Sequence, residues 1–82
     1  MMSNFRAQNL AMFGNDTEAA FQKEFTQRNF ATLQAALADP RLPISAIGYV
    51  ADLQNSDCSW PVALDRMKMI RRHIPEIKFW GE

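Results

Sequence analysis

Four sites that disfavour the continuation of a helix divide this chain into segments. Gly14, Pro40, the polar cluster NSDCS (55–59) and Pro75 separate stretches in which apolar residues recur at helical spacing. Glycine is favoured just beyond the C-terminus of a helix, and proline cannot continue a helix without losing a hydrogen bond. The sequence therefore predicts an all-α fold: a small single-domain bundle (1–82) of three to four helices with a short extended C-terminal tail.

The four stretches predict helices over residues 3–13, 15–38, 43–54 and 60–74, followed by a tail over 75–82. Each predicted start carries a residue that is favoured at a helix N-terminus, either a capping side chain or a first-turn proline. These residues are Ser3, Asn15, Pro43 and Ser59.

The second stretch holds two apolar rows rather than one. Phe21 and Phe25 are an i,i+4 pair, and a second row begins at Phe30, turned by about 120° from the first at helical periodicity. Two interpretations remain open. One continuous helix contacts different neighbours along its length, which is typical of a central helix in a small bundle, or the helix breaks near residues 27–29.

The third stretch is apolar on nearly every side. Only Ser45, Gly48 and Asp52 form a narrow polar strip, so this helix is expected to be the most buried. Gly48 beside Ser45 is a position at which another helix could approach closely. The predicted core consists of Leu33, Leu37, Ile47, Val50, Leu64, Met67 and Ile70.

The tail raises a separate question, because Phe79 and Trp80 follow the proline that ends the last helix. Fully burying one such aromatic side chain is worth about 2–3 kcal/mol, a large share of a small domain's stability. Docking of the tail on its own core is therefore the preferred interpretation. Docking on a partner, including a second copy of the chain, is the alternative.

Composition excludes several kinds of chemistry. One cysteine and one histidine cannot form an internal disulfide or a four-ligand zinc site. Cys58 and His73 are predicted at opposite ends of one helix, about 20 Å apart at 1.5 Å per residue, so a catalytic dyad is not expected. No glycine-rich phosphate loop is present in the sequence. We expect a protein that is not an enzyme, with no cofactor and no metal.

Charge and hydropathy limit the partners and the compartment. Nine basic and nine acidic residues give a net charge of zero, which argues against a strongly electrostatic partner and lowers the barrier to self-association. No apolar run approaches the about 18 residues that a membrane span needs. A cytoplasmic, reducing location is therefore expected, without membrane association.

These observations favour a small protein-binding module: a regulator, inhibitor or assembly subunit of the kind that bacteria and phages encode as accessory proteins. Its expected partner is another protein or a second copy of itself. The alternative is a small nucleic-acid-binding transcriptional regulator, because Lys68 and Arg71 belong to a basic cluster on the last helix. The candidate partner-binding residues are Arg66, Met69, Arg72, His73, Phe79 and Trp80.

Overall fold

The computed structural model describes residues 16–55 and 58–82, and within those ranges the regular secondary structure is helical, without any strand. A helix covers 16–27 and is followed by α2 (Ala31–Ala38), the 3-10 turn η1 (Ile44–Ala46), α3 (Ile47–Gln54) and α4 (Trp60–His73). The all-α prediction is confirmed. The helix predicted over 3–13 lies outside the described residues.

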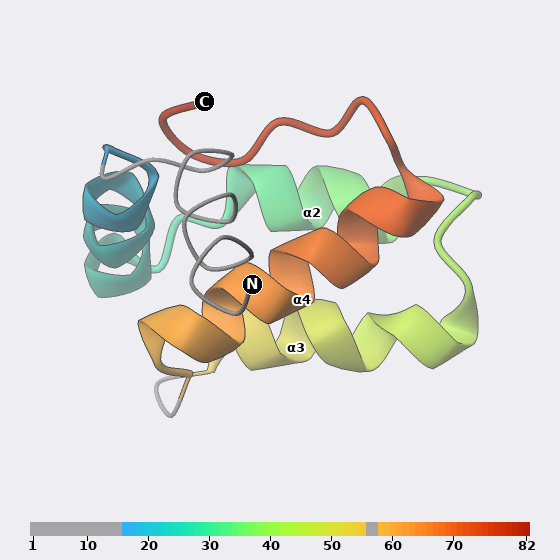
Figure 1. Cartoon of the computed structure of the whole chain (residues 1–82), viewed down its shortest axis with the longest axis horizontal. Coiled ribbons are helices and arrows are strands. Elements are labelled where there is room, and N and C mark those ends of the chain that lie inside the picture. The colour runs from blue at the N-terminus through green and yellow to red at the C-terminus, as the bar shows by residue number, and fades with distance from the viewer. Residues whose placement is uncertain (1–15, 56–57) are drawn as a thin grey trace, which may run out of the picture.

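α4 packs against α3 more extensively than α2 does (Figure 1). α2 packs against α3 as well. The C-terminal segment leaves the end of α4 and runs back across the upper part of Figure 1 toward the 16–27 helix. The two ends of the described chain are thereby joined through one apolar core.

The helix predicted over 15–38 is wrong as a continuous element, because the chain breaks between residues 27 and 31. Arg28 adopts a left-handed conformation with φ of 57°. Its N–H donates to the Phe25 carbonyl at 3.2 Å, and the Asn29 N–H donates to the Glu24 carbonyl at 3.0 Å. This pair of hydrogen bonds is the Schellman motif, which normally recruits glycine at the left-handed position. Arginine occupies it here, with its guanidinium 4.9 Å from the Phe25 ring centroid.

The core draws on every described helix. α4 buries Ala63, Met67 and Ile70 on one stripe, as its periodicity predicts. The other helices and the tail supply the remaining members of the apolar cluster: Phe21, Phe30, Leu33, Ala36, Val50, Leu53, Ile74, Phe79 and Trp80.

Two predicted core residues are exposed and a third is only half-buried. Leu37 is 39% exposed and Ile47 is 44% exposed, while Leu64 packs at the edge of the core. The inward line of α2 runs through Leu33 and Ala36, and Leu37 lies about 100° beyond Ala36 around the helix. Leu37 therefore points away from the covered side.

The third helix is buried along one side only, whereas its apolar pattern predicts burial on nearly all sides. η1 and α3 bury Ala46, Val50 and Leu53, and the opposite side is open, with Ile44 87% exposed. The reason is that α2 and α4, which contact α3 among the described residues, lie along its buried side. An apolar pattern all round a helix does not specify how many neighbours that helix has.

The tail docks on its own chain, which is the first of the two alternatives. Phe79 and Trp80 are 2% and 5% exposed, and the Trp80 ring centroid lies 5.1 Å from that of Phe21. Gly81 follows with φ of 78°, and a Cβ there would lie 2.8 Å from the Asp16 carbonyl carbon. The backbone of the tail therefore touches the 16–27 helix at a point where only glycine fits.

A single arginine ties the tail to α4. The Arg71 Nη2 atom donates to the Ile77 carbonyl at 2.9 Å and to the Glu82 Oε2 atom at 2.5 Å. The same carboxylate oxygen accepts the Phe79 N–H at 2.6 Å. These charge-assisted contacts fix the backbone on both sides of the two buried aromatic residues.

Candidate functional site

The six candidate partner-binding residues do not form one surface. Phe79 and Trp80 lie in the core, where a partner has no access to them in this conformation. Met69 and His73 are half-buried near the end of α4, and Arg72 is exposed beside them. A contact made by Met69, Arg72 or His73 would therefore lie at the C-terminal end of α4.

Arg66 is engaged within the chain. Its Nε donates to Asp52 Oδ2 at 2.7 Å, and its Nη1 donates to Asp65 Oδ2 at 2.7 Å. The guanidinium carbon also lies 5.6 Å from the Tyr49 ring centroid. The hydrogen bond to Asp52 is the main reason that the pKa of Arg66 is raised. This side chain links α4 to α3 rather than extending into solvent.

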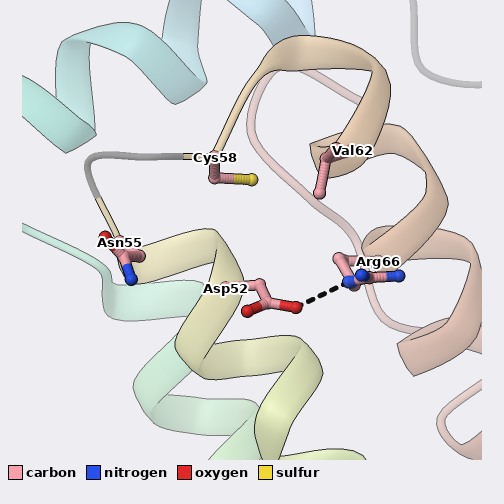
Figure 2. A pocket seen from close by; sticks show the side chains of 5 residues that line it. All are labelled: Asp52, Asn55, Cys58, Val62 and Arg66. Atoms are coloured by element: carbon pink, nitrogen blue, oxygen red, sulfur yellow. Dashed lines mark hydrogen bonds and ion pairs between the residues drawn. The ribbon is translucent and has the colours of Figure 1, made fainter.

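A shallow pocket of about 150 Å³ lies beside this pair, lined by Asp52, Asn55, Cys58, Val62 and Arg66 (Figure 2). Figure 2 shows the Cys58 thiol pointing toward Val62. Partial burial, and secondarily the charge of Asp52, raise the pKa of this thiol, while Arg66 partly opposes the shift. A reactive cysteine needs a lowered pKa, so the environment disfavours the thiolate.

The described residues do not form a metal site. Among residues 16–55 and 58–82, no three His, Cys, Asp or Glu side chains are grouped to hold a metal ion. None of the helices in these two ranges is long and apolar enough to cross a membrane.

The surface that sequence reasoning missed is the outer side of η1 and α3. Ile44, Ile47, Gly48 and Ala51 are all exposed and follow one another at i, i+3, i+4 and i+7. Residues at this spacing lie on one side of a helix, so they form a continuous apolar strip, here called the α3 face. The sequence signal for this surface is a helix that is apolar on nearly every side, of which the fold covers only one.

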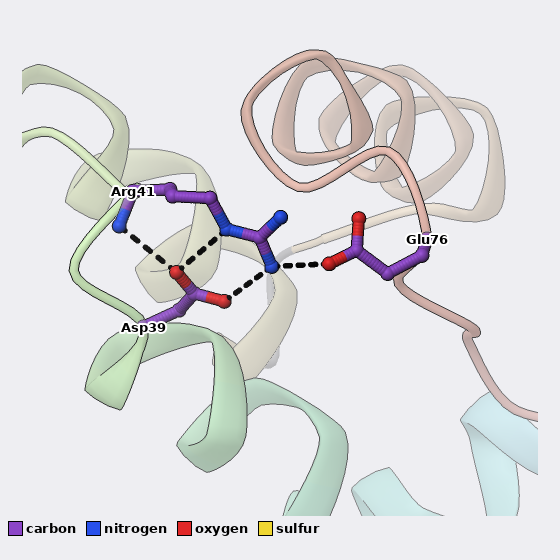
Figure 3. A network of polar contacts seen from close by, with 3 residues as sticks. All are labelled: Asp39, Arg41 and Glu76. Carbon is purple, nitrogen blue, oxygen red and sulfur yellow. Dashed lines mark hydrogen bonds and ion pairs between the residues drawn. The ribbon is translucent and has the colours of Figure 1, made fainter.

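The α3 face is also free of charge. α2 and α3 together contain one charged residue, Asp52, which is paired with Arg66. In the loop between these helices, Arg41 forms ion pairs with Asp39, at 2.8 Å, and with Glu76 (Figure 3). Asp52 and Arg41 are thus compensated within the chain.

Because of the Asp39–Arg41–Glu76 network, we expect the free energy of unfolding to depend on pH in the acid range. Hydrogen bonds from the side chain and then the backbone of Arg41 lower the pKa of Asp39 from 3.8 to about 2. The folded-state pKa lies below the unfolded one, so the ionised group stabilises the fold above about pH 4, and this contribution is lost as the pH falls toward 2. Asp39→Asn should therefore flatten the acid side of the stability profile.

Chemical denaturation of the parent and of Asp39→Asn between about pH 5 and pH 2 measures this effect. We expect a small difference, because the groups are exposed and solvent screens them. Salt at about 1 M should reduce it further. Stability profiles that stay parallel through this window at low salt would show that the network contributes nothing to the fold.

Comparison of the chain with protein families, with curated proteins and with solved structures found no match.

Proposed function

We propose that this chain is a small non-enzymatic protein-binding module that contacts its partner through the α3 face. The observation that carries the proposal is the exposure of Ile44, at 87%, next to Ile47, at 44%. Burying one large aliphatic side chain is worth about 1.5–3 kcal/mol. Two such side chains on one uncharged strip form the apolar centre that a protein interface requires. Regulation, inhibition or assembly of a larger complex are the roles that fit such a module.

The ion pairs of α4 favour this proposal over nucleic-acid binding. Arg66 is paired with two aspartates, and Arg71 is paired with Glu82 in the docked tail. Phosphate binding depends on cations that are not already neutralised. Arg72 is the most exposed arginine of the basic cluster on α4. It is therefore the best position from which to test the alternative.

A photo-reactive amino acid placed at Ile44 or at Arg72, in cells of the source organism, tests the proposed function. We expect protein adducts from position 44 that persist at high salt and are competed away by unlabelled parent protein. An Ile47→Ser competitor should compete poorly. Adducts from position 72 alone, or nucleic-acid adducts sensitive to salt, would overturn the proposal in favour of the basic helix.

A further inference from the structure

Gly48 has no internal packing reason to be glycine. A Cβ built at this position meets nothing within 4 Å, and the residue does not carry the positive φ found at Gly81. Glycine inside a helix is less favourable than alanine. The absence of a side chain therefore leaves an open notch in the middle of the α3 face, with Ile47 beside it and Ile44 one turn away.

The order of large and small residues along the α3 face is self-complementary. If two copies of the strip run antiparallel about an axis between positions 47 and 48, Ile47 falls opposite the partner's Gly48. Ile44 falls opposite the partner's Ala51. Every large side chain then meets a small one, and the same surface serves both copies, as a two-fold interface requires. Packing of large side chains into notches is also what lets two helices approach closely.

We propose that the α3 face is the interface of a homodimer, in which two copies pack antiparallel with Ile47 seated in the notch at Gly48 of the other copy. This inference rests on the proposed function and names the partner as a second copy of the chain.

Electrostatics fit a second copy. The α3 face has no charged residue, so apposing two identical strips brings no like charges together. Asp52 is the nearest charge on α3, and in this register it falls opposite position 43, a proline. Asp52 is in addition paired with Arg66 of its own chain. A net charge of zero for the whole chain removes long-range repulsion between copies.

The expected dimer is weak. Four residues, two of them glycine and alanine, present much less than the about 800 Å² per partner of a standard interface. A dissociation constant on the order of 10–100 μM is therefore expected. The dimer should form and dissociate over the concentration range that sedimentation covers.

Sedimentation equilibrium of the parent, of Gly48→Leu and of Val62→Ser tests the interface. The parent should show a monomer–dimer equilibrium, and Gly48→Leu should weaken it at least tenfold by filling the notch. Leucine fits the isolated chain because the space beside Gly48 is open. Val62 is an exposed apolar residue on another helix, at 38%, so Val62→Ser is the matched control and should dimerise like the parent. Circular dichroism confirms that each variant is folded.

Disulfide trapping tests the register. In a Cys58→Ser background, an Ile44→Cys chain mixed with an Ala51→Cys chain should form the mixed disulfide. Positions 44 of two antiparallel copies would be separated by roughly 10 Å along the helices, which is beyond the reach of a disulfide. Ile44→Cys alone should therefore trap poorly. Equal trapping of identical positions would overturn the antiparallel arrangement.

The outcomes separate this inference from the proposed function. A parent that stays monomeric to millimolar concentration, while position 44 still forms adducts with a different protein, overturns the homodimer and leaves the protein-binding proposal standing. A monomer that forms no adduct at position 44 overturns both. A dimer that Gly48→Leu does not weaken places the interface elsewhere and overturns the inference.

Discussion

Removal of residues 79–82 should unfold the chain, or leave it with a small fraction of its stability. The deletion takes away Phe79 and Trp80, which are 2% and 5% exposed, and the Glu82 carboxylate that holds Arg71. Truncating one buried aromatic side chain typically costs about 3–5 kcal/mol. Two such losses approach the whole free energy of unfolding of a small domain. Thermal and denaturant unfolding followed by circular dichroism measures the effect.

Two single substitutions, Gly81→Ala and Gly48→Ala, test the fit of the tail without removing its aromatic side chains. Gly81→Ala adds one methyl group, but its Cβ would lie 2.8 Å from the Asp16 carbonyl carbon at a positive φ, so the tail must shift and stability should fall. Gly48→Ala adds the same methyl group in open space and, in dilute solution, should raise stability by about 0.5–1 kcal/mol. If the chain that lacks residues 79–82 melts at the same temperature as the parent, the docked tail does not stabilise the core.

Ile70→Ala should destabilise the chain far more than Leu37→Ala, although the two residues have similar apolar volume. Ile70 is 0% exposed in the centre of the core, so its loss should cost about 2–5 kcal/mol through transfer and cavity terms. Leu37 is 39% exposed, so its truncation leaves no closed cavity and should cost about 1 kcal/mol or less. Denaturant midpoints of the two variants provide the comparison.

Equal costs for Ile70→Ala and Leu37→Ala would contradict the exposed position of Leu37 on α2.

The helices that begin and end at local signals could be predicted from the sequence. α4 starts at Trp60 with Pro61 in its first turn and ends at His73 before Pro75, because the restrictions that proline imposes act on neighbouring residues alone. The start near Pro43 was predictable for the same reason. The break at Arg28 was not, because a left-handed arginine leaves no glycine in the sequence to mark it. Only the shift between the two apolar rows indicated it, and that shift had two interpretations.

The candidate site was less predictable, since it depends on which apolar residues the fold covers. Trp80 and Ile44 are both large apolar residues near a proline, yet one is 5% exposed and the other is 87% exposed. The difference arises from contacts with distant segments: Phe21 covers Trp80, whereas α2 and α4 both lie on the inner side of α3. Hydrophobic periodicity shows which surface of a helix favours burial. It does not show whether the residues that bury it belong to the same chain.

The docking of Trp80 on Phe21 also has a consequence for the order of folding. The two rings are separated by about sixty positions along the chain, so their contact closes a long loop, and the entropic cost of closure precedes any gain from packing. The helices form from neighbours in sequence and can appear early, whereas the aromatic cluster depends on a pairing that only the collapsed chain can make. Until that loop closes, Phe21, Phe79 and Trp80 remain uncovered together, which makes this interval of folding the one most exposed to aggregation.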